Sequence, residues 1–179
     1  MLGNFNLIIS TYRNRENDCI SEVWFTLKDL GIGKINVSKT GLPGLIVARI
    51  DKNPIEVVEK IRELAETNPW NFHFILKIVP IETVIETNLD KIKSVALKFA
   101  EEKIGPEETY KIDPVIRLST LRRSEVIEAI APYIKNKVNL ENPDKILRIE
   151  IIGSLTGISV LKPQHILSIV KIRREKRVH

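Results

Sequence analysis

The sequence predicts an α+β fold made of two small units, residues 1–80 and residues 81–179. Apolar residues alternate with polar ones in short runs, which is typical of strands, and recur every three or four positions in longer runs, which is typical of helices. Turn-forming segments separate these runs. Residues 80–83 form the boundary, and because this segment is not rich in Gly or Ser, we expect the units to be docked and not freely tethered.

The first unit has the predicted order strand, helix, strand, strand, helix, strand. A helical pattern over residues 17–30 stops at Gly31, and a second helix begins at Asn53-Pro54, with Asn as cap and Pro in the first turn. The predicted strands are residues 5–10, 35–37, 45–50 and 72–79. This βαββαβ order is the ferredoxin-like arrangement.

The second unit is predicted to start with a long helix over residues 88–104. A strand over residues 110–117 follows, and Ser119 or Thr120 opens a helix that Pro132 kinks or shortens. The remaining predicted strands are residues 145–152, 158–161 and 166–172.

Positive charge is concentrated in the second half of the chain. The 179 residues are 43% hydrophobic and 28% charged, which is typical of a globular protein, and carry a formal net charge of +5. Residues 1–80 hold ten basic and nine acidic side chains, against eighteen and fourteen in residues 81–179. Polyanion binding gains from such an excess because counterions are released.

The composition also indicates location and source. No apolar run approaches the ~20 residues that span a bilayer, and residues 1–4 lack the features of a signal peptide, so we expect a cytoplasmic protein without a membrane partner. Abundant charged residues with one glutamine and one methionine favour a thermophilic source.

Catalytic and metal-binding motifs are missing from the sequence. There is no phosphate-binding Gly loop, no HExxH and no CxxC. The single cysteine, Cys19, lies in a helical pattern and is expected to pack, and the three histidines are scattered. We therefore expect no catalysis, no cofactor and no metal site.

The strongest functional pattern is a basic cluster at the start of a helix. Arg117 ends a strand, and Arg122 and Arg123 follow in the first turn of the next helix. Cations are unfavourable at a helix N-terminus unless an anion neutralises them, and the planar guanidinium suits a phosphate. The alternative is a solvated helix face that pairs with Glu125.

Other basic residues are further candidates for binding a nucleic acid. Lys135 and Lys137 follow the C-terminus of the same helix, where a cation is favourable even without a bound RNA. Residues 173–177 form either a disordered basic tail or an edge that contacts phosphate. Because no exposed aromatic pair is evident, phosphate and shape recognition of a folded RNA fits better than base stacking. The candidate residues are Arg117, Arg122, Arg123, Lys135, Lys137, Lys162, His165, Lys171, Arg173 and Arg174.

Residues 80–171 resemble a THUMP domain. The resemblance rests on the long helix, on YKIDPVIR followed by LRRSEVI, and most specifically on VNLENPDKILRIEII. The resemblance implies that the chain binds the acceptor region of tRNA. The RNA-contacting positions that it implies in this sequence are Arg117, Arg122, Arg123 and Lys162. The glycine-rich GGLP element of thiouridine synthases is reduced here to Leu161-Lys162-Pro163.

No enzyme segment follows the module in these 179 residues, so we expect a stand-alone protein, and the chain resembles the adaptor of an RNA cytidine acetyltransferase, which forms 4-acetylcytidine. The segment IEIIGSLTGISVLKPQHILSIVK is similar to the C-terminal strand pair of that group. Two alternatives stay open. One is an RNA-binding subunit of a tRNA thiolation or methylation enzyme, and the other is a metabolite-binding regulator built on the ferredoxin-like unit.

Overall fold

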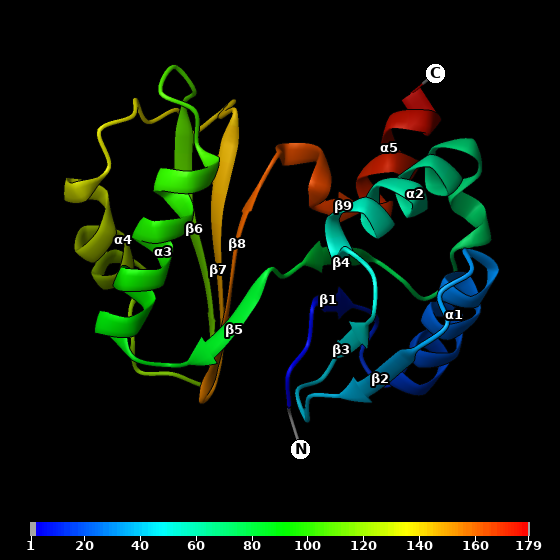
Figure 1. Cartoon of the computed structure of the whole chain (residues 1–179). Coiled ribbons are helices and arrows are strands. Elements are labelled where there is room, and N and C mark those ends of the chain that lie inside the picture. Colours follow the sequence, from blue (N-terminus) through cyan, green and yellow to red (C-terminus); the bar gives the residue numbers. More distant parts are fainter. Residues whose placement is uncertain (1–2, 179) are drawn as a thin grey trace. The chain divides into compact units, whose positions relative to one another are not determined.

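The computed structural model describes residues 3–178 and divides into two compact units. Unit 1 comprises Met1–Ile81 together with His165–His179, and unit 2 comprises Glu82–Gln164 (Figure 1). The sequence had placed all of residues 81–179 in the second unit, whereas the structure returns the last segment to unit 1. None of the helices in residues 3–178 is long and apolar enough to cross a membrane.

Unit 1 confirms the predicted βαββαβ order. Its five-stranded antiparallel sheet has the strand order β2-β3-β1-β4-β9, and the central strand β1 pairs Ile9 with Ile46 of β3 and Ile78 of β4. The elements are β1 (Leu7–Ser10), α1 (Glu16–Asp29), β2 (Ile35–Lys39), β3 (Leu45–Ile50), α2 (Pro54–Thr67), the 3-10 turn η1 (Pro69–Asn71) and β4 (Lys77–Pro80).

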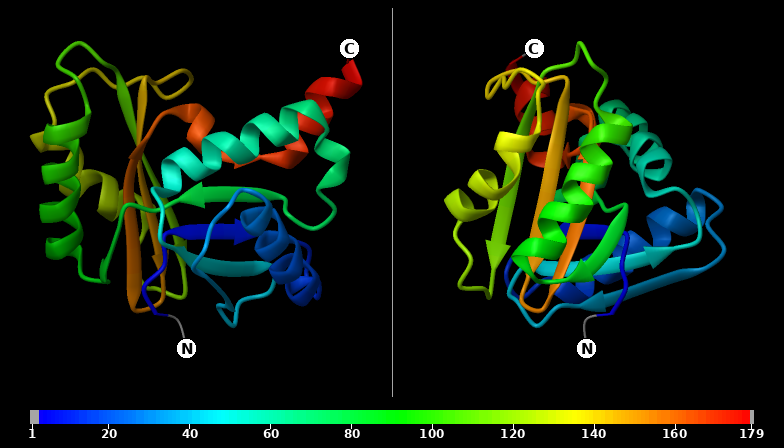
Figure 2. Two further views of the ribbon diagram at one scale, coloured as in Figure 1. Left: turned by 45° about the vertical axis from the view of Figure 1, so that its right-hand side comes forward. Right: turned by 60° about the vertical axis from the view of Figure 1, so that its left-hand side comes forward.

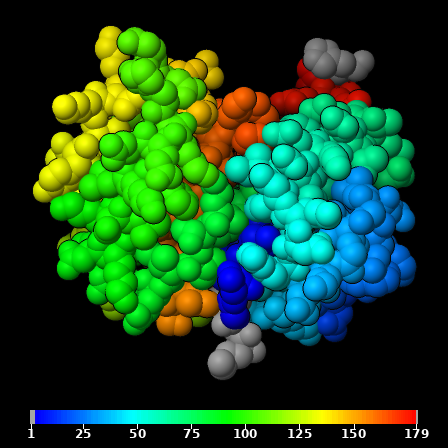
Figure 3. All heavy atoms as spheres, in the orientation of Figure 1, coloured from blue at the N-terminus to red at the C-terminus, as the bar shows by residue number. Residues whose placement is uncertain are grey.

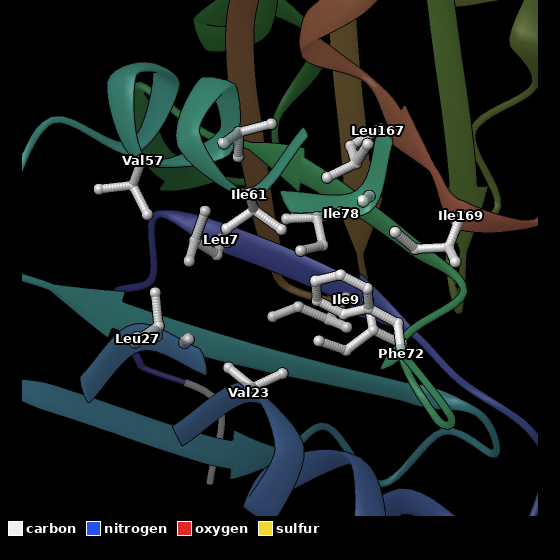
Figure 4. Packing of buried hydrophobic residues seen from close by; sticks show 14 of the residues in the cluster. Leu7, Ile9, Val23, Leu27, Val57, Ile61, Phe72, Ile78, Leu167 and Ile169 are labelled. Carbon is white, nitrogen blue, oxygen red and sulfur yellow. The ribbon is translucent and has the colours of Figure 1, made fainter. Parts of the chain in front are cut away.

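The helices of unit 1 bury an apolar face against its sheet. Val23 and Leu27 of α1 and Ile61 of α2 meet Leu7 and Ile9 of β1 in one cluster (Figure 4). Asn53 caps α2 as predicted, since its Oδ1 accepts hydrogen bonds from the backbone N–H groups of residues 55 and 56. Cys19 packs in the same core, and burial raises the pKa of its thiol to about 12.

The segment before β4 corrects one prediction. Residues 72–76 are not in a strand, and the buried side chains of Phe72 and Ile75 lie three positions apart and not two, as strand alternation would require. Both carboxylate oxygens of Glu22 instead accept backbone N–H groups of His73, Phe74 and Ile75, at 2.9 to 3.2 Å. A side chain therefore replaces the sheet as the partner of these donors.

The C-terminal segment corrects a second prediction. Only β9 (Leu167–Ser168) is a strand, and it pairs with β4 after the 3-10 turn η3 (Pro163–His165). The predicted strand over residues 166–172 and the predicted basic tail are mostly one helix, α5 (Ile169–Val178). Ile169 and Ile172 lie three positions apart, so they face the unit 1 core from one side of that helix.

Unit 2 is a four-stranded sheet with helices on one face, as the additional views show (Figure 2). The strand order is β5-β8-β7-β6, and β6 and β7 are parallel whereas the other pairs are antiparallel. The elements are β5 (Thr83–Glu86), α3 (Leu89–Lys103), β6 (Tyr110–Arg117), α4 (Arg123–Ile130), the 3-10 turn η2 (Ala131–Tyr133), β7 (Lys145–Ile152) and β8 (Leu155–Leu161). In the view of Figure 3, green spheres of residues in and around α3 cover much of the visible face of this unit.

Two boundaries in unit 2 differ from the prediction. The predicted boundary segment, residues 80–83, ends on the first residue of β5, an edge strand that precedes the predicted first helix and pairs Thr83 with Ile158 of β8. The helix expected to open at Ser119 or Thr120 begins at Arg123. It ends at Ile130 and passes into η2, which contains Pro132, so the expected shortening is confirmed.

Candidate nucleic-acid interface

The loop between β6 and α4 brings three of the predicted arginines together. Arg117 is the last residue of β6, Arg122 is the N-cap of α4, and Arg123 is the first residue of that helix. The carbonyl of Arg117 accepts the backbone N–H of Gly153, so the turn between β7 and β8 holds the beginning of the loop. The three arginines are therefore at the two ends of one loop, Arg117 at its start and Arg122 and Arg123 where it enters α4.

Leu118 gives this loop an unusual conformation. Its φ is 55°, in the left-handed region that costs a non-glycine residue about 1 kcal/mol or more, and it is 70% exposed. An exposed apolar side chain thus stands beside Arg117 at the start of the loop. Such a strained and exposed position is characteristic of a contact surface and not of a packed core.

Arg122 is the most exposed cation of the loop, with 80% of its side chain accessible. Its Nε lies 3.2 Å from Oε1 of Glu125, which also accepts the backbone N–H of Arg122. These hydrogen bonds, with that of the side chain contributing most, lower the pKa of Glu125. The pairing expected for a solvated helix face is thus present, and it leaves both Nη groups of Arg122 without a recorded protein partner among residues 3–178.

Arg117 and Arg123 are the two ends of a continuous ion-pair network. Asp113 Oδ1 binds Arg123 at 3.0 Å, and its Oδ2 binds Arg148 at 2.6 Å. Arg148 Nε then binds Glu150 Oε1 at 2.9 Å, and Glu150 Oε2 binds Arg117 at 2.6 Å. The network follows the register of the sheet, because Asp113 of β6 pairs with Arg148 of the parallel strand β7.

The pKa of Asp113 responds to this network. Burial favours the neutral acid, but the charges of Arg148 and Arg123 outweigh burial and lower the pKa of Asp113 below its ordinary value.

A lowered folded-state pKa of Asp113 stabilises the protein above the unfolded pKa, about 3.9, and that stability is lost as pH falls toward the folded-state value. We expect the free energy of unfolding to fall with acidification in this window. In the Asp113→Asn variant, urea unfolding across pH 2.5–6 should show a shallower fall, and an equally steep fall would contradict this assignment.

The other predicted residues of unit 2 lie at the opposite end of its sheet. The carbonyl of Lys137 accepts the backbone N–H of Tyr110, the first residue of β6, and the last residue of β8 pairs near the start of β7. Lys135, Lys137 and Lys162 are thus separated from Arg117 by the length of β6, about 23 Å at ~3.3 Å per residue. The structure thus separates the predicted residues of unit 2 into two groups, one at each end of the sheet.

The remaining predicted residues lie in unit 1, where two of them make structural contacts. His165 is buried, and its Nε2 lies 2.8 Å from Oε1 of Glu59. Arg173 donates to the backbone carbonyls of Pro69 and Phe72. Lys171 and Arg174, on the same helix α5, are exposed.

Sequence reasoning missed an aromatic contact on α5. The guanidinium carbons of Arg173 and Arg177 lie 5.3 and 4.9 Å from the ring centre of Trp70, which is exposed. Four residues separate the two arginines, so both lie on one side of the helix. The four-residue spacing of Arg173 and Arg177 was visible in the sequence. Their contact with Trp70 depends on the return of the C-terminal segment to unit 1.

The comparison with protein families concerns this same unit. Residues 86–161, from the last residue of β5 to the last residue of β8, match the model of the THUMP domain. The chain contains a THUMP domain. The basic loop between β6 and α4 and the ion-pair network lie inside it.

A curated relative of the THUMP-containing chain is MJ0421 of Methanocaldococcus jannaschii, described as an uncharacterized protein. It is 23% identical over 175 residues, which cover 95% of this chain and 44% of the relative. The chain thus spans less than half the length of that relative.

Three solved structures share the fold. PH1313 from Pyrococcus horikoshii is 20% identical with a TM-score of 0.60, over 89% of this chain and 55% of that one. TrmN from Thermus thermophilus is 14% identical with a TM-score of 0.60, over 86% of this chain and 44% of that one. A 4-thiouridine synthetase in complex with RNA and bound ATP is 17% identical with a TM-score of 0.53, over 88% of this chain and 41% of that one.

Proposed function

We propose that this THUMP-containing chain binds tRNA at its acceptor region and presents it to a tRNA-modifying enzyme. The observation that carries the proposal is the trio of arginines at the two ends of the β6–α4 loop, inside the THUMP domain. A helix start supplies backbone N–H groups, and arginine forks bind phosphate oxygens in pairs. One solved structure of similar fold, a 4-thiouridine synthetase, is a complex with RNA, which supports RNA as the ligand class.

We further propose that the chain contributes binding and that a partner contributes the chemistry. Within residues 3–178, no three His, Cys, Asp or Glu side chains gather as ligands for a metal ion. The resemblance of its C-terminal strands to the adaptor group favours a cytidine acetyltransferase that forms 4-acetylcytidine as the partner. The alternative, an RNA-binding part of a thiolation or methylation enzyme, is supported by solved structures of similar fold, which include a 4-thiouridine synthetase and a protein described as a putative methyltransferase.

Binding of tRNA to the purified chain tests the first part of this proposal. We expect submicromolar affinity for tRNA at 50 mM salt, weakening at least tenfold by 200 mM because several phosphate contacts release counterions. Unstructured poly(U) of the same length should bind more weakly if the shape of a folded RNA is recognised. Equal affinity for both RNAs, or no shift of tRNA at low salt, would contradict the proposal.

Reconstitution with candidate enzymes separates the two kinds of partner. If the chain is an adaptor, its addition should stimulate 4-acetylcytidine formation by the acetyltransferase on tRNA, and a variant that no longer binds tRNA should not. Stimulation of thiolation or methylation instead, with no effect on acetylation, would favour the alternative.

A further inference from the structure

Burying the central part of the ion-pair network costs free energy of folding. Glu150 is only 1% exposed in its side chain, and Arg148 is 9% exposed. Removing two charges from water costs several kcal/mol per ion, which their attraction offsets only with good geometry and full hydrogen bonding. A buried network of this kind is weak evidence for stability. Its role is better explained by the side chains that it holds in place.

The network holds its two outer members at defined points. Both oxygens of Asp113 and both oxygens of Glu150 bind a guanidinium, so neither carboxylate is free to turn. Exposure increases outward from the centre: the side chain of Arg117 is 27% exposed and that of Arg123 is 55% exposed. Each outer arginine is recorded in its ion pair through Nη1, and Arg123 also donates from this atom to the carbonyl of Pro114.

The remaining donors of these arginines are therefore fixed and available. Among residues 3–178, no protein partner is recorded for Nε and Nη2 of Arg117 or of Arg123. An arginine that is already ordered loses less side-chain entropy when it binds a phosphate than a freely rotating one. The arrangement thus provides two preorganised arginines, one at each end of the β6–α4 loop.

We propose that Asp113 and Glu150 are positioning residues, which hold Arg117 and Arg123 in the orientation that binds RNA phosphates. This assignment rests on the proposed function. It adds that two carboxylates strengthen RNA binding, although their charge alone would repel RNA. Glu150 acts on Arg117 directly, Asp113 acts on Arg123 directly, and Arg148 links the two carboxylates.

The sign of a charge-removing substitution tests this proposal. Asp113→Asn and Glu150→Gln each raise the net charge by one, which by electrostatics alone favours RNA binding. If the carboxylates position the arginines, each variant should instead bind tRNA about tenfold more weakly, as expected for loss of a charged hydrogen bond. The slope of log affinity against log salt should also become shallower by about 0.9 for each lost phosphate contact.

Glu128→Gln is the matched control, because Glu128 is exposed on α4 and the substitution changes the charge by the same amount. It should bind tRNA as tightly as the wild type or more tightly. Circular dichroism shows whether each variant is folded, and Asp113→Asn alone decides the test if Glu150→Gln does not fold, since Asp113 is more exposed.

Two outcomes would overturn the assignment in different ways. Folded Asp113→Asn protein that binds tRNA as well as Glu128→Gln, with an unchanged salt slope, overturns the positioning role and leaves the proposed function intact. Wild-type protein that does not bind tRNA at low salt overturns the proposed function and the positioning role together.

Discussion

Replacing Arg117, Arg122 and Arg123 together with alanine is expected to weaken tRNA binding about 100-fold at 0.1 M salt. The estimate follows from loss of charged hydrogen bonds that contribute about 1 kcal/mol or more each. Because these contacts also release counterions, the log–log salt slope should become shallower by about 2 to 3. Fluorescence anisotropy with labelled tRNA across 50–300 mM salt measures both quantities.

The control for this variant removes the same charge elsewhere. Lys34, Lys52 and Lys60 are exposed in unit 1, and no ion pair is recorded for them among the described residues. Their triple replacement by alanine should reduce tRNA affinity only a few-fold, through net charge. If the two triple variants lose the same affinity, the basic loop is not a specific site.

Replacing Glu22 with alanine is expected to destabilise unit 1 by about 3 kcal/mol. The substitution removes one carboxylate that accepts three successive backbone N–H groups, those of His73, Phe74 and Ile75. Charged hydrogen bonds contribute about 1.5–3 kcal/mol, and partly buried donors that lose their acceptor add a desolvation penalty. Urea unfolding at neutral pH, followed by circular dichroism, measures the change in free energy.

Asp29→Ala provides the matched comparison on the same helix. Asp29 is the last residue of α1 and exposed, with no ion pair recorded for it among the described residues, so its removal should change stability by less than about 0.5 kcal/mol. A Glu22→Ala protein as stable as Asp29→Ala would show that the loop before β4 does not depend on this carboxylate.

Most of the fold was predictable because its signals are local. The Asn53-Pro54 cap, the helical spacing of Val23 and Leu27, and the effect of Pro132 each lie within a few residues of the element that they determine. Two of the errors arose where a distant residue decides the structure. Glu22 binds backbone groups about fifty positions away, and β9 pairs with β4 only because the chain returns to unit 1.

The candidate site shows the same division. Arg117, Arg122 and Arg123 are close in sequence, so their cluster was predictable. The alternation in residues 145–152 placed Arg148 and Glu150 on one side of a strand, but their contacts with Asp113 and Arg117 depend on the parallel register of β6 and β7. Lys135, Lys137 and Lys162 were grouped with the arginines by charge, and the strand geometry separates them.

Hydrogen exchange of the wild-type protein with and without tRNA tests the central claim most directly, because it needs no substitution. If RNA binds at the basic loop, amides of residues 118–124 should exchange at least several-fold more slowly in the complex. The hairpin between β2 and β3, residues 40–44, serves as the internal reference and should not change. Protection elsewhere in the chain, with none at residues 118–124, would contradict the assignment of this loop as the RNA-binding site.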